Sequence, residues 1–533
     1  MNPPPSLFSR LALTAFTVLA LLASSLNGLA QDPLFEFTGL HPTEPSNWQK
    51  PENWKMNGLD AGRPPGTGPD DRVVITGYSV TNPANTVKEV ILNGAITGGF
   101  LNITRNLVLN GGAITACTIT LFDNASLTSN GSGLNALDSC VVNNRGTFWP
   151  LVVSLGAFGS QPATVLNNDT TGKIWLSDGG AINCLSSARI DSIGQILKVS
   201  GTKTAAITGG KLTQSGAGSV GCEGGTLSLG TGGGGAFISS RPIVPSGVGS
   251  VIEITGLLSE LKAGSHISGF GLVRIRFATL SGAITVDNIE MSDGAILQGP
   301  GDMKLYGTFN FLGGSFNGEL LNGNINTISP VPKLDIQPGA TLRLTVNNSS
   351  PILTRNLRNA GTILHGISSP MGVSPGATRT PSLDNLPTGV IAFSSTGGLG
   401  ARSLNNAGTL VKTNNTDLNS GILLSGICTN SGLIDVQTGM LRFSGLQQTA
   451  GELRIAAGAE ARFNSGPISL ITGGVISGNG TLRGVAPGTL GGTLRPGTSA
   501  GTLTLRLIFP LVSELFLMKP LVPGCFLAVF CCL

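Results

Sequence analysis

The histidines and cysteines are the side chains of this sequence best suited to metal binding or nucleophilic chemistry. The three histidines, His41, His266 and His365, lie far apart in the sequence. Five cysteines are spread through the body of the chain, at Cys117, Cys140, Cys184, Cys222 and Cys428. They form no C-x-x-C pair, so their spacing gives no zinc or redox motif. We therefore predict no metal site and no cofactor, and we expect these cysteines to be small buried side chains.

Cleavage of a polysaccharide would require two carboxylates facing one sugar bond, or a basic residue beside bound calcium. Asp287, Glu290 and Asp293 are close in sequence, but their pattern places them on one polar face of a single turn. The Arg-Ile-Arg string at 274–276 is similar to a basic motif of polygalacturonases, yet the Gly-His-Gly and paired aspartates of that family are missing. We predict no catalytic residue, and a secreted polysaccharide lyase or glycoside hydrolase stays as the alternative function.

The composition excludes several classes of protein. Glycine accounts for 78 of 533 residues, roughly twice its usual share, and only 11% of residues are charged. With 40% hydrophobic residues the chain differs from disordered proteins. The net charge of +4 is spread without a basic stripe, so nucleic acid is not an expected partner.

A short sequence motif that recurs along the chain indicates the architecture of most of the protein. NAGTI begins at Asn359, NAGTL at Asn406 and NSGLI at Asn430, so the last two copies are 24 residues apart and the first is 47 residues upstream. Asn144 and Asn168 begin related strings, also 24 residues apart. A period of this size with a short strand in each copy is typical of coiled, stacked β-architectures. The corner residues that we predict to be structural are Asn359, Gly361, Asn406, Gly408, Asn430 and Gly432.

Strand alternation lets the apolar residue two positions after each glycine point into a shared interior. These residues are Phe148, Ile174, Ile363, Leu410 and Ile434. In the stretch 451–463, the alternation predicts Leu453, Ile455, Ala461 and Phe463 inside, and Glu452, Arg454, Glu460 and Arg462 in water. We expect the corner glycines to supply left-handed backbone angles and the corner asparagines to stack into a hydrogen-bonded ladder. The prediction is an all-β chain that forms a single-stranded, parallel, right-handed β-helix. The alternative is a hairpin turn of an ordinary sandwich.

Residues 1–30 have the features of a secretory signal peptide. Arg10 precedes the apolar stretch 11–23, and small residues at 28–30 predict cleavage before Gln31. An uncleaved membrane anchor is the alternative, although 13 apolar residues are short for a span.

Residues 31–85 predict an N-terminal cap for the coil. This segment contains Trp48, Trp54, a loop rich in proline and glycine, and Asp70-Asp71 before a Val-Val-Ile strand. It resembles the entry segment of many secreted bacterial β-helix proteins. An open coil end exposes strand edges and an apolar interior, and therefore needs a cover. A sugar-stacking site made by the two tryptophans is the alternative.

Residues 86–505 are predicted to form the repeats, which at about 24 residues per turn gives roughly 17 turns. The stretch 366–387 is rich in proline and serine, and we expect it to loop out of the coil. The closing string GGTLRPGTSAGTLTL, residues 491–505, resembles the end of autotransporter-associated β-strand repeats. In that family a membrane-embedded barrel often follows. Here the hydrophobic tail 506–533 follows instead, which we expect to be a truncated or frame-shifted reading, or else a sorting or anchoring segment.

The resemblance implies an exported, non-catalytic, adhesin-like protein of the bacterial cell surface, secreted or associated with the outer membrane. The expected partners are carbohydrate, matrix or cell-surface ligands. The expected function is the display of a long, weakly charged surface.

Overall fold

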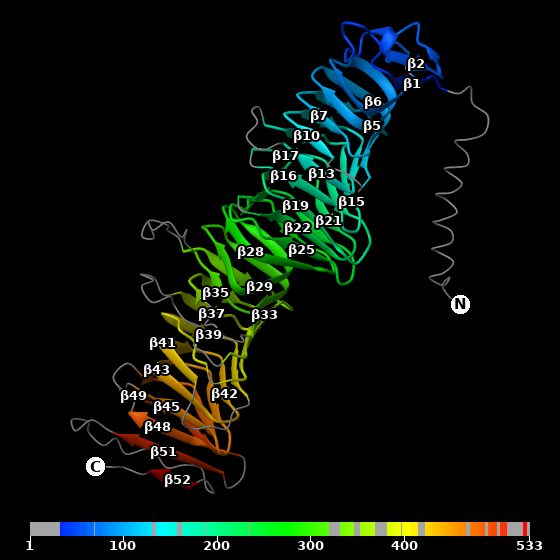
Figure 1. Cartoon of the computed structure of the whole chain (residues 1–533). Helices are drawn as coiled ribbons and strands as arrows, with labels where there is room; N and C mark the ends of the chain where they lie inside the picture. Colours follow the sequence, from blue (N-terminus) through cyan, green and yellow to red (C-terminus); the bar gives the residue numbers. More distant parts are fainter. Residues whose placement is uncertain are drawn as a thin grey trace, which may run out of the picture.

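The computed structural model of the chain is a long rod of β-strands (Figure 1). About 60% of the chain is strand and 1% is helix, and the parallel strands form a β-solenoid of about 16 turns. This confirms the predicted all-β parallel solenoid, and the number of turns is close to the predicted one. The structure describes residues 32–68, 70–130, 135–156, 163–185, 187–232, 234–318, 331–345, 352–367, 381–395, 397–413, 422–464, 469–485, 489–497, 501–508 and 526–529. The predicted signal peptide lies outside these residues.

The described strands fall into three groups in the N-terminal half of the rod. The entry elements are β1 (Leu34–Phe37), the 3-10 helix η1 (Pro51–Asn53), β2 (Trp54–Met56) and β3 (Leu59–Asp60). Long strands follow: β4 (Arg72–Thr81), β5 (Ala84–Thr97) and β6 (Phe100–Leu109). The short strands are β7 (Ala113–Thr115), β8 (Thr118–Leu121), β9 (Ser126–Ser129), β10 (Ala136–Asp138), β11 (Val141–Asn144), β12 (Thr147–Pro150), β13 (Val152–Leu155), β14 (Val165–Asn168), β15 (Lys173–Leu176), β16 (Ala181–Cys184), β17 (Arg189–Ser192), β18 (Gln195–Lys198), β19 (Thr204–Thr208), β20 (Lys211–Gln214), β21 (Val220–Cys222), β22 (Thr226–Thr231), β23 (Ala236–Ser239), β24 (Pro242–Pro245), β25 (Val251–Ile254), β26 (Glu260–Leu261) and β27 (His266–Ile267).

Long strands return in the second half, between runs of short ones. The long strands are β28 (Leu272–Leu280), β29 (Ile284–Gln298), β30 (Met303–Phe311), β41 (Ile422–Asn430) and β43 (Met440–Gln448). The others are β31 (Ser315–Phe316), β32 (Lys333–Ile336), β33 (Thr341–Leu344), β34 (Ile352–Leu353), β35 (Asn356–Asn359), β36 (Thr362–His365), β37 (Ser382–Asn385), β38 (Val390–Phe393), β39 (Ser403–Asn406), β40 (Thr409–Lys412), β42 (Leu433–Val436), β44 (Glu452–Ile455), β45 (Glu460–Phe463), β46 (Leu470–Ile471), β47 (Val475–Gly478), β48 (Thr481–Val485), β49 (Thr489–Leu490), β50 (Thr493–Pro496), β51 (Thr502–Ile508) and β52 (Phe526–Val529).

Each short strand between β8 and β23 pairs in parallel with the strand three further along the chain, so one turn contains three strands. Val141 pairs with Val165 and Val165 with Arg189, which reproduces the predicted 24-residue period. The period is shorter where a long strand replaces two short ones, because a corner loop is lost. Val273 of β28 pairs with Ile289 of β29, only 16 residues further on.

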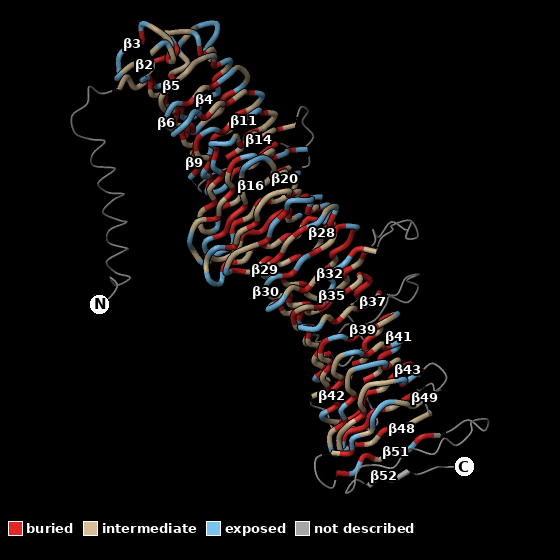
Figure 2. The backbone as a smooth tube through the Cα atoms, turned by 180° about the vertical axis from the view of Figure 1, so that it is seen from behind, coloured by how far each residue is buried: buried red, intermediate tan, exposed pale blue. Residues whose placement is uncertain are grey.

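Buried residues occur along the whole length of the rod (Figure 2), and the buried apolar side chains form one core. All five apolar residues that follow the motif glycines are buried, as predicted. One line of buried side chains continues through the second half in register, through Leu227, Ile252, Val273, Ile289, Phe309, Leu342, Ile363, Ile391, Leu410, Ile434, Leu453 and Ile476.

One alternation prediction was wrong. Glu460 was expected in water, but it is buried, with its carboxylate 3.8 Å from Nη1 of Arg483. It is the first residue of β45, and Met440 and Thr481 of the neighbouring turns flank it in the sheet. Burial at a strand end therefore depends on the neighbouring turns as well as on strand alternation.

The predicted reason for the motif glycines was also wrong. Gly361, Gly408 and Gly432 do not have left-handed backbone angles. A Cβ at Gly408 would lie 2.3 Å from the carbonyl oxygen of Gly389, and one at Gly432 would lie 2.2 Å from that of Gly408. These corners need glycine because successive turns approach too closely for any side chain.

We predict that Gly432→Ala lowers the free energy of unfolding by about 2–3 kcal/mol, because the added methyl group must push two turns apart. Denaturant unfolding would measure the loss. Gly62→Ala is the matched control, since a Cβ there meets no atom within 4 Å and should change stability by less than about 0.5 kcal/mol. Equal stability of the two variants would contradict the packing argument.

Two boundaries differ from the expected ones. The segment 366–387 was predicted to loop out, but Ser382–Asn385 forms β37, which pairs with β35 and β39 inside the coil. At the C-terminal end, β51 continues to Ile508, and β52 pairs with it in parallel. The stack of strands therefore extends into residues that were assigned to the tail.

Candidate functional site

A groove lies on the outer face of the rod where the second set of long strands, β28 to β30, begins. In two successive turns, the loops 246–250 and 268–271 lead into β25 and β28 at the same corner. In the next turn β29 passes this corner without a loop, and β30 does the same. The two loops therefore border a groove over the following two turns. This groove has a volume of about 330 Å³.

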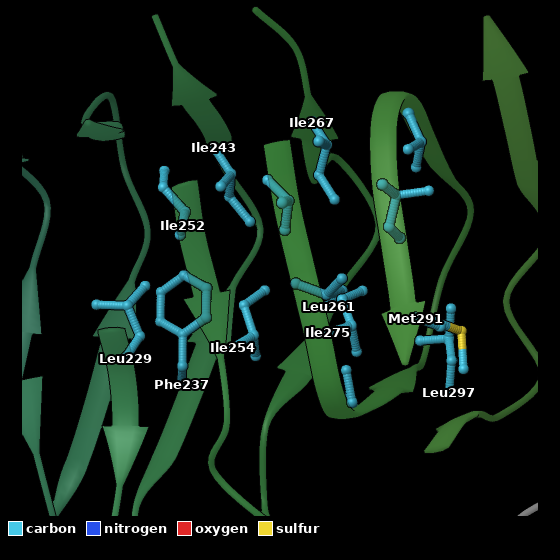
Figure 3. Packing of buried hydrophobic residues seen from close by; sticks show 14 of the residues in the cluster. Leu229, Phe237, Ile243, Ile252, Ile254, Leu261, Ile267, Ile275, Met291 and Leu297 are labelled. Carbon is cyan, nitrogen blue, oxygen red and sulfur yellow. The ribbon is translucent and has the colours of Figure 1, made fainter. Parts of the chain in front are cut away.

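The sheet under this groove is closely packed. Ile252 and Ile254 of β25, Ile275 of β28 and Met291 of β29 are buried beneath it, with their side chains packed together (Figure 3). Their backbones are paired in parallel register. The groove therefore has a fixed floor, which is the arrangement that gives precise placement of binding groups.

Uncharged polar groups and one aromatic ring line the groove. The polar residues are Ser250, Asn288, Thr308 and Asn310, and the ring is that of Phe270, which is 84% exposed. The Asn288 amide donates to the Gly269 carbonyl (3.1 Å) and accepts from the Thr308 N–H (3.3 Å). Asn288 thus fastens the overhanging loop to the strand below.

Three charged side chains flank the groove on the same face. Arg274 donates to Glu253 (2.6 Å) and to Glu290 (2.8 Å), which lie on the turns before and after it. Asn310 follows Glu290 in the same register. The hydrogen bond to Glu290, and then the one to Glu253, raise the pKa of Arg274 against the opposing effect of burial. These two carboxylates and one guanidinium carry a net charge of −1, and Arg343, which pairs with Asn310 on the next turn, balances it.

Metal chemistry has little support in the described part of the chain. There, no group of three or more His, Cys, Asp or Glu side chains is placed to hold a metal ion. The five predicted cysteines are buried with free thiols, in line with their expected role as small core residues. Burial raises the pKa of the Cys184 thiol to about 12, so this thiol is not a nucleophile at neutral pH.

The three histidines lie in separate parts of the rod. His41 is in the entry segment, where its Nδ1 accepts from the Glu44 N–H (2.9 Å). His266 contacts the Thr285 hydroxyl on the next turn. His365 is buried beside the Phe393 ring, and neither of its ring nitrogens has a hydrogen-bond partner among the described residues. Burial lowers the pKa of His365 to about 4.

We predict an acid-sensitive contribution to stability from His365. Its folded pKa of about 4 is below the ordinary value of 6.5, so the stability is fully present above pH 6.5 and is lost as the pH falls toward 4. The loss between pH 7.5 and 4.5 should be about 2–3 kcal/mol. Denaturant unfolding at both values should show this loss reduced in His365→Leu and retained in His266→Leu. An unchanged pH dependence in His365→Leu would contradict the prediction.

The predicted cap residues lie together in the entry segment. The Trp48 and Trp54 rings meet edge to face at 5.0 Å, and both rings are buried. Trp48 Nε1 donates to the Pro65 carbonyl (3.1 Å) and Trp54 Nε1 to the Trp48 carbonyl (2.9 Å). Buried rings cannot stack on a sugar, so the alternative of a sugar site at these tryptophans was wrong.

Asp71 braces the proline-rich loop of the same segment. Both of its carboxylate oxygens accept from Arg63 (2.5 and 2.6 Å), and one also accepts from the Gly66 N–H (2.7 Å). Burial alone would raise the pKa of Asp71, but the hydrogen bonds from Arg63, Gly66 and Gly68 outweigh it and lower the pKa. The role of Asp71 is therefore structural.

The corner asparagines form two hydrogen-bonded ladders inside the coil. In the first, the Asn144 amide donates to Asn168 (2.7 Å), and Asn168 donates to the Ser192 hydroxyl (3.0 Å). The second ladder is longer and runs through Asn359, Asn385, Asn406, Asn430 and Gln448, with amide-to-amide distances of 2.8, 2.7, 2.8 and 2.9 Å. All of these side chains are buried, and the ladder prediction is confirmed.

Three sets of residues were missed from the sequence. Asn385 occupies the turn between Asn359 and Asn406, which the 47-residue gap implied. The string NLPTGVI begins at Asn385 and matches NDTTGKI at Asn168, so the sequence did contain a signal for this residue. Arg355 is buried over the Phe316 ring at 4.5 Å, and burial lowers its pKa to about 9. Neither Arg355 nor the groove residues have a sequence signal, because neighbouring turns bring each set together.

Comparison with known proteins finds no match. No protein-family model matches the chain, and no curated protein or solved structure is significantly similar to it. None of the helices among the described residues is long and apolar enough to cross a membrane.

Proposed function

We propose that this chain is an exported, non-catalytic, adhesin-like protein that displays an extended binding surface on a stiff rod. The observation that carries the proposal is the continuous parallel stack of about 16 turns with one shared core. Successive strands in such a stack are about 4.8 Å apart, so the outer faces form long, regular surfaces. Folds of this kind commonly use extended surfaces for binding.

The outer surface offers apolar contacts in addition to the groove. Trp149, Leu151 and Val152 are each roughly two-fifths exposed, and the Trp149 ring meets the Trp175 ring of the next turn edge to face at 5.8 Å. Exposed aromatic and aliphatic groups of this kind favour contact with partners. Carbohydrate, matrix and cell-surface ligands are therefore the partners that we propose.

The cellular location of the protein is proposed from its sequence. The segment 1–30 supports export, and the closing string at 491–505 supports a relation to autotransporter passengers. Both features support the location that we propose, which is secreted or on the cell surface, with association to the outer membrane.

The second candidate function is cleavage of a polysaccharide, and the Glu253–Arg274–Glu290 cluster favours it. Hydrolases place two carboxylates on one sugar bond, one as a proton donor and the other as a base or nucleophile. Here both carboxylates accept hydrogen bonds from the same guanidinium, which is typical of a structural ion-pair cluster. Binding without cleavage is therefore the favoured function.

Two measurements on the purified chain test the choice. Incubation with neutral glucans, pectin and alginate, with calcium present, should release no reducing ends and no unsaturated uronate. Immobilised glycans or matrix material should retain the chain. Release of products that Glu290→Gln abolishes would overturn the proposal in favour of the enzyme.

A further inference from the structure

We propose that the groove over β25, β28, β29 and β30 binds a neutral glycan chain. This inference rests on the proposed binding function and assigns it a site and a ligand class. The ring of Phe270 would stack on a sugar face, while the polar groups of Asn310 and Thr308 would bind its hydroxyls.

The backbone on both sides of Phe270 is held in position, although the ring itself is exposed. The Asn288 amide holds the Gly269 carbonyl on one side of it, and on the other the Gly271 N–H donates to the Pro245 carbonyl (2.8 Å). The two flanking glycines fit tightly, since a Cβ at Gly271 would lie 2.3 Å from the Ser250 hydroxyl oxygen. A loop backbone held in this way presents the ring without the entropy cost of ordering the loop on binding.

The floor of the groove offers hydrogen-bonding groups that the protein leaves open. The side chains of Thr308 and Asn310 have no hydrogen-bond partner within the described part of the chain, and both line the groove. An amide supplies donors and an acceptor, and a hydroxyl supplies one of each. This set matches sugar hydroxyls, which also donate and accept.

The size of the groove favours an oligosaccharide. Its lining residues come from β25, β28, β29 and β30, four strands on successive turns of one face, and from the loops before β25 and β28. Three spacings of about 4.8 Å give a length of roughly 14 Å along the rod. Its volume of about 330 Å³ is near the lower end of the range for ligand sites.

The uncharged lining of the groove favours a neutral glycan over an acidic one. Glu253, Arg274 and Glu290 together carry −1, and Arg274 is held by both carboxylates. Arg343, which pairs with Asn310 on the next turn, brings the sum along this line of side chains to zero. A uronate chain therefore gains no net electrostatic attraction from these side chains, and it would lie next to the Glu253 and Glu290 carboxylates. A neutral hexose or N-acetylhexosamine chain avoids this repulsion.

Calorimetry and saturation-transfer NMR with neutral hexasaccharides, derived from β-glucan and from chitin, would test the proposal. We expect binding of at least one of them, with a preference over hexagalacturonate. Phe270→Ala should weaken binding about tenfold, which corresponds to a loss of about 1.4 kcal/mol of ring stacking. Asn310→Ala should weaken it about fivefold.

Phe100→Ala is the matched control, because Phe100 is 58% exposed on β6, in the N-terminal part of the rod (Figure 1). It should bind like the parent chain, and all three variants should melt like the parent. The proposal is overturned if no neutral hexasaccharide binds at millimolar concentration, if the acidic one binds better, or if Phe270→Ala binds like the parent. If the chain binds matrix material but no glycan, the glycan site is refuted and the proposed binding function stands. If the chain cleaves the glycan, the proposed non-catalytic function is refuted.

Discussion

Ile434→Asp is expected to prevent cooperative folding of the C-terminal turns. Ile434 is completely buried, with Leu410 on the turn before and Leu453 on the turn after it in the same line of side chains. The substitution removes an apolar side chain and places an unpaired carboxylate in the core, which should cost at least about 5 kcal/mol. Because each turn is stabilised by its neighbours, the loss should spread to the turns that follow.

Limited proteolysis and thermal melting followed by circular dichroism would measure this effect. The matched control is Ile427→Asp, at an isoleucine of β41 that is 39% exposed. The control should keep the C-terminal turns protected from protease. If Ile434→Asp melted like the parent chain, the inward register of this line would be wrong.

Asn406→Asp is expected to lower the free energy of unfolding by about 4 kcal/mol, although the two side chains have the same shape. The Asn406 amide donates to the Asn430 side chain (2.8 Å) and to the Leu433 carbonyl (3.1 Å). A carboxylate cannot donate either bond, and it would face the Asn430 oxygen as a buried charge. Leaving buried groups unpaired and adding a charge makes this loss larger than that of a single hydrogen bond.

Hydrogen exchange would locate this loss in the turns that contain Asn385, Asn406 and Asn430, and denaturant unfolding would give its size. Asn464→Asp is the control, because Asn464 is exposed just after β45. Its stability should differ from that of the parent chain by less than about 0.5 kcal/mol. Equal stability of the two variants would show that the ladder is dispensable.

The sequence by itself determined the type of fold, the 24-residue period, the inward register and the ladder. These are local properties, because Ile363, Ile434 and Asn406 each recur at a fixed place relative to a corner. The sequence also located the entry segment with its two tryptophans. It misjudged the motif glycines and Glu460, because the surroundings of each are set by the turn above or below.

Only the tertiary structure decided where a ligand could bind. Ser250, Phe270, Asn288 and Asn310 come from four successive turns, and no spacing in the sequence joins them. The groove exists because two turns carry a corner loop and the next two do not. Its shape therefore results from a difference between neighbouring turns. The same is true of Arg274, which meets one carboxylate 21 residues before it and another 16 residues after it. A periodic sequence predicts what all turns share, whereas a site is made where adjacent turns differ.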